Sequence, residues 1–393
     1  MRASSNRPVP TILLSATEPS ADAMGASLLR RLRERLPDVR FVGCGGGAMT
    51  EAGLKTAFDP SGLAVMGLAD AARAVPEALR GARALATLAA AERVDAAVLI
   101  DAWGFSRLAA PRIARAAPGA ALVKLAAPQV WATRPGRARF VRDRFDLVLT
   151  LLPFEPPLFD GGRARAVHIG NPNFRAVADA PRDGAAFRAR HALGDAPVLL
   201  VLPGSRAAEV DRLMPVFAEA SRRVATQVEG LRLVIAAAPP VADAVMQAAA
   251  GWQVPPLIVP GAERFDAMAA ADAALAASGT VTTELAICGV PMTVAYRTDA
   301  LTAAWVRRIV VTPFASIVNV AAGEAVVPER LQEDCTPARL ASDALCLLTD
   351  EAARTRQRSA FARIVPDLLG QGDDPATRAA AEIATLIGNG PRP

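Results

Sequence analysis

The sequence is poor in the residues that build metal and thiol sites. It has only two histidines, His168 and His191, and its four cysteines are widely separated. Their spacing fits neither a zinc site nor a disulfide framework. Two histidines also make a catalytic Ser–His pair a weak hypothesis. We therefore expect no metal ion in the site.

Long apolar runs are missing as well. Arg, Pro and Asp interrupt every apolar segment before it reaches the ~20 residues that a membrane span needs. The first ten residues are polar, and the apolar segment Thr11–Ala16 is too short for a secretory signal. We therefore expect a cytoplasmic protein. Aromatic residues are 5% of the chain, and no basic tract contains interleaved aromatics, which argues against nucleic-acid binding.

Lysine is almost absent, since Lys55 and Lys124 are the only two, and arginine supplies nearly all of the positive charge. A genome that favours Ala and Arg codons accounts for the larger part of this bias. The net charge of +5 leaves room for attraction to phosphates or to an anionic membrane surface.

The chain does contain enough apolar residues for two domains. Its 393 residues are 52% hydrophobic and 21% charged, which excludes a disordered protein and exceeds one compact core. Short apolar runs alternate with long segments that suit crossover helices, as in parallel sheets. The predicted strands are 11–15, 40–43, 97–101, 121–125, 147–151, 167–169, 198–202, 232–236, 257–259, 273–277 and 292–294.

A polar stretch with Pro and Arg at residues 173–195 separates the two series of strands. We therefore predict an α/β fold of two doubly wound, Rossmann-like domains, residues 1–180 and 181–345. Helices over residues 346–393 would pack back on the first domain or be exchanged in a dimer.

Unusual residues follow the strands in both halves, where open parallel sheets bind ligands. They are Glu18–Asp22, Asp101, Pro128–Trp131, Gly204–Arg206 and Ser278–Thr280. Two such edges facing each other would form a cleft between the domains.

The segment Ser278-Gly279-Thr280 leads from a strand into a helix that contains Glu284. Small residues admit a phosphate to the free N–H groups of the helix start, and Glu284 can accept hydrogen bonds from a ribose. Arg206, at a similar junction, can clamp a diphosphate. The alternatives are an ordinary capped helix and an arginine paired with a surface acid.

Asp101 ends an apolar strand, so partial desolvation of its carboxyl group would suit it to general-base work. A structural aspartate that caps the next turn is the alternative. Ser20 or Asp22 is expected to be the N-cap of a helix running to about Leu36, which leaves Glu18 unexplained. We interpret Gly43–Gly47 as a close-approach turn, with no helix directly after it.

Read in order, several segments resemble the lipid-A-disaccharide synthase family of inverting glycosyltransferases, which have the GT-B fold. They are E-P-S-A-D (18–22), L-A-V-M-G (63–67), I-D (100–101), P-Q-V-W-A-T-R-P-G-R (128–137), L-L-P-F-E-P-P (151–157), L-P-G-S-R-A-A-E-V (202–210), A-A-S-G-T-V-T-T-E-L (276–285), P-M-T-V-A-Y-R (291–297) and L-Q-E (331–333). The chain departs from the family at Thr17, Ala21, Gly104 and Ser106, where the pattern has Gly, Gly, Asp and Asn.

The resemblance implies transfer of 2,3-diacylglucosamine from its UDP conjugate to 2,3-diacylglucosamine 1-phosphate, which gives a β-1,6 disaccharide and UDP. It implies no cofactor, a peripheral position at the inner face of the cytoplasmic membrane, and a homodimer. The first domain would supply catalysis and the acceptor site, and the second would bind the UDP-sugar.

The resemblance also assigns site residues. Asp101 would be catalytic, with Glu18 and Asp22 as further candidates. The substrate-binding candidates are Ser20, Met66, Gln129, Trp131, Arg206, Ser278, Gly279, Thr280, Glu284 and Asn319. Two other functions stay open: another UDP-sugar glycosyltransferase or epimerase on the same fold, and a catalytically silent relative that binds nucleotide or lipid.

Overall fold

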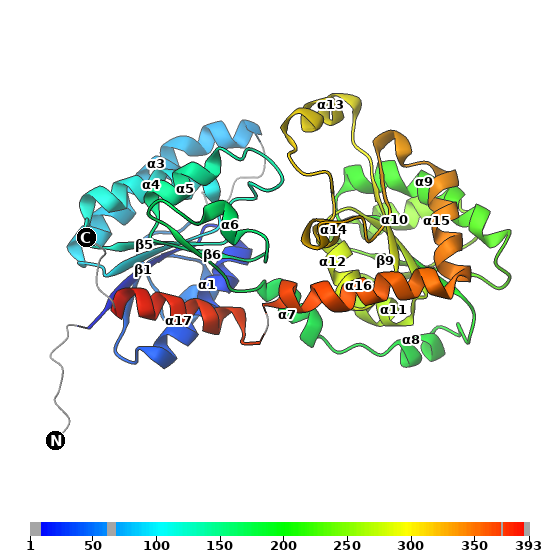
Figure 1. Cartoon of the computed structure of the whole chain (residues 1–393), viewed down its shortest axis with the longest axis horizontal. Coiled ribbons are helices and arrows are strands. Elements are labelled where there is room, and N and C mark those ends of the chain that lie inside the picture. Colours follow the sequence, from blue (N-terminus) through cyan, green and yellow to red (C-terminus); the bar gives the residue numbers. More distant parts are fainter. Residues whose placement is uncertain (1–8, 61–67, 371, 389–393) are drawn as a thin grey trace, which may run out of the picture. The chain divides into compact units, whose positions relative to one another are not determined.

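The computed structural model describes residues 9–60, 68–370 and 372–388. The chain forms two compact units (Figure 1). The first unit contains residues 1–172 and 370–393, and the second contains residues 173–369. Helix α16 (Glu351–Leu369) belongs to the second unit, and α17 (Pro375–Gly388) belongs to the first. Each unit is built around a parallel sheet, so the predicted α/β class is confirmed.

The first unit has a seven-stranded sheet in the order β3-β2-β1-β4-β5-β6-β7, in which every neighbouring pair is parallel. The strands are β1 (Thr11–Ser15), β2 (Arg40–Cys44), β3 (Lys55–Thr56), β4 (Ala96–Ile100), β5 (Ala121–Leu125), β6 (Leu147–Thr150) and β7 (Arg165–His168). The helices besides α17 are α1 (Pro19–Arg35), α2 (Gly47–Glu51), α3 (Leu68–Ala91), α4 (Trp103–Ala116), α5 (Arg137–Arg144) and α6 (Pro156–Phe159).

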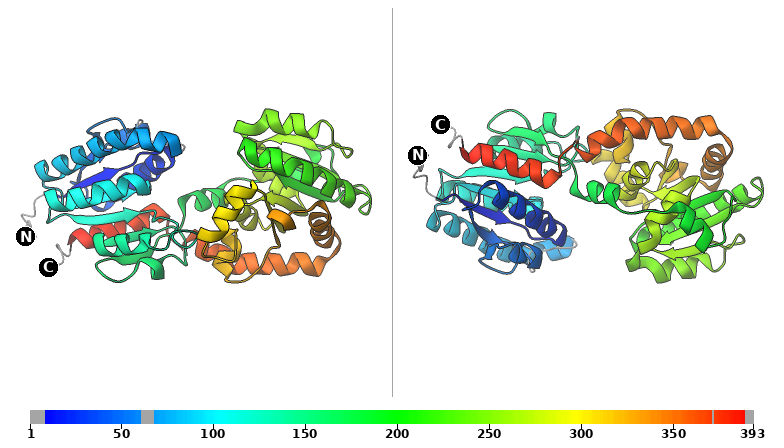
Figure 2. Two further views of the ribbon diagram at one scale, coloured as in Figure 1. Left: turned by 90° about the horizontal axis from the view of Figure 1, so that it is seen from above. Right: turned by 90° about the horizontal axis from the view of Figure 1, so that it is seen from below.

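Successive residues of a strand point to opposite sides of the sheet, so these apolar strands have two faces to bury. Helices cover both faces. In β1, Ile12 and Leu14 join the core under α1 and α17, whereas Leu13 joins the core under α3, α4 and α5. Figure 2 shows α17, in red, beside α1, in dark blue, which agrees with their direct contacts. The carboxyl-terminal helix therefore completes one layer of the first unit.

The second unit has a six-stranded parallel sheet in the order β10-β9-β8-β11-β12-β13. The strands are β8 (Val198–Leu202), β9 (Arg232–Ala237), β10 (Leu257–Pro260), β11 (Ala273–Ala277), β12 (Met292–Tyr296) and β13 (Glu329–Leu331). The helices besides α16 are α7 (Pro172–Asp179), α8 (Gly184–Arg190), α9 (Ala207–Ala225), α10 (Ala242–Ala249), α11 (Arg264–Ala270), α12 (Thr280–Ile287), α13 (Ala300–Ile309), α14 (Ile317–Ala322) and α15 (Pro337–Thr349). Helices α9, α10 and α15 share one buried core with the sheet.

The eleven predicted strands are present, with ends that differ by at most two residues. Strands β3 and β13 were not predicted, because they have only two and three residues and lack an apolar run. No helix that the described ranges contain combines the length and apolarity needed to cross a membrane.

The glycine-rich segment Gly43–Gly47, which starts within β2, makes a close approach to β1, as predicted. A Cβ on Gly43, whose φ is +142°, would lie 1.9 Å from the Leu14 carbonyl oxygen. The expectation that no helix follows directly is wrong, since α2 begins at Gly47. That helix has only five residues, and the N–H groups at its start donate to the carboxylate of Asp22, which is distant in sequence, so the local pattern carries no signal for it.

Candidate active site

In the first unit, the candidate residues are brought together by strand order. Strand β4 lies between β1 and β5, and the three run parallel, so their carboxyl ends share one edge. Glu18 lies in the loop after β1, Asp101 in the loop after β4, and Gln129 in the loop after β5. Met66 lies outside the described residues.

Asp101 stands in a strained turn at this edge. Asp101 and Ala102 have φ angles of 45° and 40°, the left-handed region that costs non-glycine residues ~1–3 kcal/mol each. The Asp101 N–H donates to the Leu125 carbonyl at 2.8 Å, and α4 begins two residues later. Asp101 is exposed, so the predicted partial burial is wrong. The chain turns away from the apolar sheet directly after Ile100, which leaves this side chain in solvent.

Lys124 holds the Asp101 turn from inside the unit, a contact that sequence reasoning missed. Its ammonium group is fully buried in β5 and donates to the carbonyl oxygens of Leu99, at 3.3 Å, and Asp101. It also donates to the Ser106 hydroxyl at 3.1 Å, and that hydroxyl donates to the Asp101 carbonyl at 2.9 Å. The available signal was a lysine inside an apolar strand, in a chain with only two lysines.

The charge of Lys124 is poised near neutral pH. Burial lowers the pKa of Lys124 to about 7, and the negative charges of Asp101 and Glu18 oppose this lowering. The two candidate carboxylates and the lysine therefore form one electrostatic group. Glu18 and Ser20 are exposed.

Asp22 is committed to a second helix. Its carboxylate accepts hydrogen bonds from the backbone N–H groups of Gly46, Ala48 and Met49 at 2.7, 3.0 and 3.2 Å. These are the free donors at the start of α2. The prediction that Ser20 or Asp22 is the N-cap of α1 is wrong, because Glu18 takes that position, without a side-chain capping bond. The contacts of Asp22 are therefore those of a structural residue.

The segment after β5 contains two of the predicted substrate-binding residues, one exposed and one half-buried. Gln129 is exposed, and Trp131 packs edge-on against Phe154 with ring centroids 5.3 Å apart. Glu155 is buried beside them and accepts hydrogen bonds from its own loop, from Leu152 N–H at 3.0 Å among others. Burial raises the pKa of Glu155 to about 7.

Positive charge gathers beside Trp103, two residues after Asp101. The Arg137 guanidinium carbon lies 5.5 Å from the centroid of the Trp103 ring. Burial lowers the pKa of Arg137, and the positive charges of Arg134 and Arg107 lower it further. Arg107, Arg134 and Arg137 make no ion pair with the side chains that the structure describes. This edge is therefore suited to an anionic substrate.

In the second unit, Arg206 lies at the edge formed by β8, β11, β12 and β13. It is the N-cap residue of α9, and its Nη1 is 2.6 Å from Glu209 Oε1. The other Glu209 oxygen accepts from Ser205 N–H at 3.1 Å. The pairing with an acid, which the sequence left open, is therefore present. The Arg206 side chain is nevertheless 79% exposed and accessible to a ligand.

The Ser278 loop presents an open helix start on the same edge. Gly279 is the N-cap residue of α12, no side chain caps this helix, and Gly279 and Thr280 are exposed. Ser278 donates to the Ala315 carbonyl at 3.3 Å. Glu284, one turn into α12, is 3.2 Å from Arg264 Nε. The free N–H groups of this start can accept a phosphate.

Asn319 is fully buried, and its amide is used within the unit. The amide nitrogen donates to the Val327 carbonyl at 2.9 Å and to Glu329 at 2.8 Å, and the amide oxygen accepts from Val327 N–H at 2.9 Å. These contacts position the segment before β13.

Metal ligands do not gather in the part of the chain that the structure describes. Within residues 9–60, 68–370 and 372–388, no three His, Cys, Asp or Glu side chains lie together as a possible metal site. The arrangement offers carboxylates together with three arginines on the first sheet edge, and further donors for anions on the second.

Comparisons of sequence identify close relatives. Residues 12–384 match the family described as lipid-A-disaccharide synthetase. The chain is 40% identical over 384 residues to the lipid-A-disaccharide synthase of Paramagnetospirillum magneticum, covering 96% of this chain and 98% of the relative. It is 42% identical over 375 residues to that of Rhodospirillum centenum, covering 94% and 93%.

Solved structures with the same fold are more distant in sequence. A UDP-N-acetylglucosamine 2-epimerase has a TM-score of 0.60 at 15% identity, over 98% of this chain and 97% of the other. A calicheamicin glycosyltransferase has a TM-score of 0.55 at 18% identity, over 97% and 99%. A protein from Anabaena, in complex with UDP and glucose, has a TM-score of 0.53 at 12% identity, over 97% and 100%. These likenesses confirm the GT-B fold.

One family profile spans nearly all of the chain, and relatives of similar length share about 40% of its residues. The chain therefore belongs to the lipid-A-disaccharide synthetase family of glycosyltransferases.

Proposed function

We propose that this chain transfers 2,3-diacylglucosamine from UDP to 2,3-diacylglucosamine 1-phosphate, with inversion, to form the β-1,6 disaccharide and UDP. One observation supports this most strongly: Asp101 is exposed in a turn held by a buried lysine, in a chain whose full-length relatives carry this activity in their names. A carboxylate that stands on a fixed turn and is accessible meets the requirements of a general base.

Asp101 would take the proton from the acceptor 6-hydroxyl as that oxygen attacks the anomeric carbon from the face opposite UDP. The bond from that carbon to the diphosphate oxygen breaks in the same step, and the charge departs on UDP. Lys124 and Ser106 would keep the Asp101 turn in place during the transfer. Glu18 would share the negative field around the acceptor, and Asp22 would act only through α2.

The second unit would bind the donor. Arg206 and the N–H groups at the start of α12 would stabilise negative charge on the departing diphosphate. Ser278, Gly279 and Thr280 would admit the phosphates closely, and Glu284 would accept hydrogen bonds from the ribose. Asn319 would hold the neighbouring segment. The UDP-sugar is a substrate, and we propose no cofactor.

We also propose that the protein works at the inner face of the cytoplasmic membrane as a peripheral protein. Trp305 on α13 is 53% exposed, Val311 just after it is 54% exposed, and Arg307 and Arg308 lie between them. Apolar side chains beside arginines suit an anionic lipid surface. The family resemblance further implies a homodimer, which a measurement of molecular mass in solution tests.

The function is tested by incubating the purified chain with UDP-2,3-diacylglucosamine, with and without 2,3-diacylglucosamine 1-phosphate. We expect UDP and a β-1,6 disaccharide only when both sugars are present. Conversion of the donor to an epimer without acceptor would instead identify an epimerase. UDP binding with no product would identify a silent relative.

A further inference from the structure

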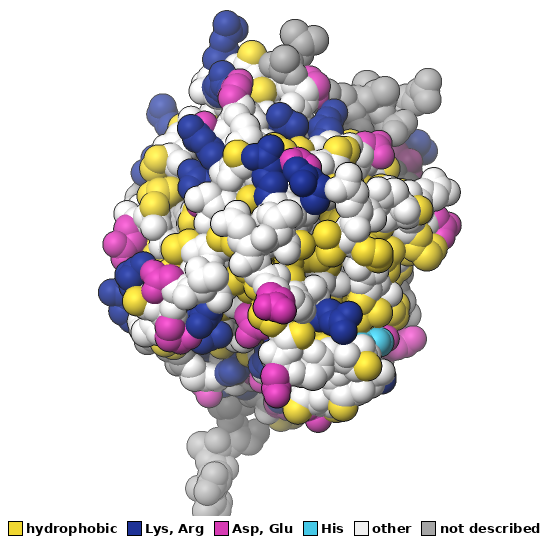
Figure 3. Space-filling model, turned by 90° about the vertical axis from the view of Figure 1, so that its right-hand side faces the viewer, with side chains coloured by type: hydrophobic (Ala, Val, Ile, Leu, Met, Phe, Trp, Pro, Cys, Tyr) yellow, Lys and Arg dark blue, Asp and Glu magenta, His cyan; other side chains and the backbone are white. Residues whose placement is uncertain are grey.

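Most arginines of the second unit have an acidic partner. Figure 3 shows basic and acidic side chains interspersed over one face of the molecule. The pairs of the second unit include Arg188–Asp272, Arg190–Glu263, Arg222–Glu219, Arg264–Glu284, Arg330–Asp343 and Arg354–Glu351. Arg232 and Arg308 make no such pair with the described residues, but both are exposed to solvent, so a half-buried arginine of this unit without an acidic partner is unusual.

Arg297 is such a residue. It follows β12 directly and is half-buried. Among the residues that the structure describes, its guanidinium makes neither an ion pair nor a hydrogen bond. Holding this charge partly out of water without a partner is costly, so a ligand is the natural source of compensation.

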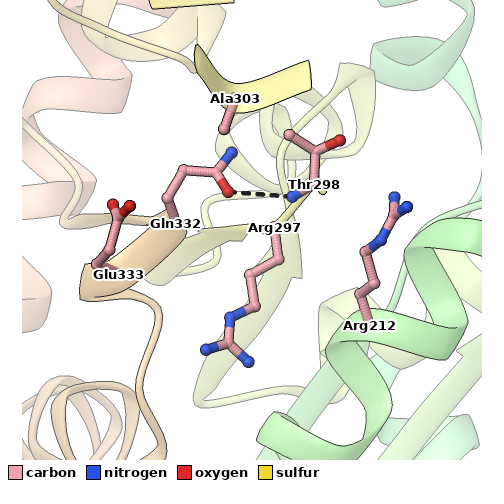
Figure 4. A pocket seen from close by; sticks show the side chains of 6 residues that line it. All are labelled: Arg212, Arg297, Thr298, Ala303, Gln332 and Glu333. Carbon is pink, nitrogen blue, oxygen red and sulfur yellow. Dashed lines mark hydrogen bonds between the residues drawn. The ribbon is translucent and has the colours of Figure 1, made fainter. Parts of the chain in front are cut away.

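Arg297 lines a pocket of about 400 Å³ (Figure 4). The other lining residues are Arg212, Thr298, Ala303, Gln332 and Glu333. Arg212 comes from α9, and Gln332 and Glu333 follow β13, so the pocket lies at the carboxyl edge of the sheet. Its volume is within the ~300–1,000 Å³ of small-molecule sites.

The acids around this pocket do not neutralise Arg297. Glu333 is engaged by Arg307, with 2.6 Å between Oε2 and Nη2. Asp299 accepts from Thr302 N–H at 2.8 Å as the N-cap of α13, and its carboxylate is 3.7 Å from Arg212. The Gln332 amide oxygen accepts from Thr298 N–H at 3.2 Å, so these two lining residues hold each other in place (Figure 4).

We propose that this pocket binds a phosphate group of a sugar substrate, with Arg297 as its main contact and Arg212 as the second. Guanidinium groups match phosphate oxygens in geometry and charge. The pocket lies beside β11, whose loop contains Ser278, so a diphosphate at the start of α12 could extend toward it. The choice of substrate rests on the proposed function, and two phosphates qualify: the diphosphate of the donor and the 1-phosphate of the acceptor.

The test is calorimetric titration of the full chain with UDP and, separately, with glucosamine 1-phosphate, at low salt. Arg297→Ala should weaken binding of one of them by about 10- to 100-fold, since a charged hydrogen bond contributes ~1.5–3 kcal/mol. Arg212→Ala should weaken the same ligand less, and Arg297→Lys should recover part of the affinity. Arg232→Ala is the matched control, because Arg232 is exposed at the amino end of β9, the opposite edge of the same sheet.

Loss of UDP affinity alone assigns the pocket to the donor, and loss of glucosamine 1-phosphate affinity alone assigns it to the acceptor. Both results support the proposal. Unchanged affinity for both ligands, in an Arg297→Ala variant whose circular dichroism and melting match the wild type, overturns it. The binding readout does not depend on turnover. A chain that binds phosphate through Arg297 but makes no disaccharide would therefore contradict the proposed function and leave this inference intact.

Discussion

The two sheet edges differ in chemistry although their architecture is the same. The edge of the first unit carries exposed carboxylates, Asp101 and Glu18, above a buried lysine. The edge of the second carries the exposed Arg206, the half-buried Arg297 and an open helix start. The first edge combines carboxylates that can take a proton with arginines that suit an anionic substrate, whereas the second offers arginines and free N–H groups to phosphates. The residues directly after each strand decide this, which is how one fold serves many reactions.

The largest expected effect comes from removing the proposed base, Asp101, at the first edge. Asp101→Asn keeps the size and the turn but cannot accept a proton, so transfer should fall by ~10²–10⁴-fold. UDP affinity should stay within about twofold, because the second unit would bind the nucleotide. Steady-state assays and calorimetry check both numbers. Turnover near the wild-type rate would remove Asp101 from its proposed role.

Replacing Lys124 tests whether the Asp101 turn needs the hydrogen bonds that support its backbone. Lys124→Met fills the same space without the hydrogen bonds to Leu99, Asp101 and Ser106. We expect kcat to fall by ~10–100-fold with a smaller change in KM, since misplacement of a catalytic group costs about this much. An unchanged kcat in a folded variant would show that the turn holds itself.

The same variant has a signature in stability. Because burial lowers the pKa of Lys124 from 10.5 to about 7, the unfolded chain binds more protons than the folded chain between these values. The stability of the wild type should therefore rise with pH from 7 to 10.5, and this contribution disappears as pH falls through 7. In denaturant titrations, the free energy of unfolding of the wild type, relative to that of Lys124→Met, should rise with pH. The rise should be a few kcal/mol, of the order that ~1.4 kcal/mol per pKa unit implies. A difference independent of pH would contradict the assignment.

At the second edge, Arg206→Ala should weaken UDP binding by ~10-fold, less than the loss at Asp101, because helix N–H groups remain. Glu209→Gln is its companion, since Glu209 holds the guanidinium at 2.6 Å. Freeing Arg206 from this acid should leave UDP affinity unchanged or slightly stronger. Equal UDP affinity in wild type and Arg206→Ala would place the diphosphate elsewhere.

The smallest effect is expected from adding a carboxylate to the first edge. Gly104 lies in the first turn of α4, and a Cβ there meets nothing within 4 Å. Gly104→Asp should stabilise the chain by ~0.5–1.5 kcal/mol, because glycine disfavours helix and an acid suits a helix start. Thermal melting measures this. A lower melting temperature would show that the new carboxylate is repelled by the carboxylates already at this edge.

The strands and the loops that follow them could be predicted from the sequence, because buried parallel strands are continuous apolar runs bounded by small and polar residues. The pattern located Asp101, Arg206 and Ser278 at the proper ends of their strands. It could not give side-chain partners. Asp22 caps α2 from 24 residues away, and Lys124 reaches a turn 23 residues earlier, so local periodicity holds no record of either contact.

Asn319 and Asp101 show that the sequence also does not predict how far a polar side chain is buried. The family pattern identified both, yet Asn319 is fully buried and used by Val327 and Glu329, and Asp101 is exposed. Whether a polar side chain meets solvent depends on elements that are distant in sequence, and no motif encodes it.

The last helix has a consequence for how the protein is made. Ala379, Ala380 and Ile383 of α17 belong to the same core as Leu28 of α1, yet residues 173–369 lie between them in the chain. On the ribosome, the later-synthesised unit can fold first, while the earlier one waits for its final layer. A nascent chain stopped at residue 369 would leave the apolar face of α1 uncovered. Chaperones and proteases could then bind this exposed surface until α17 is synthesised.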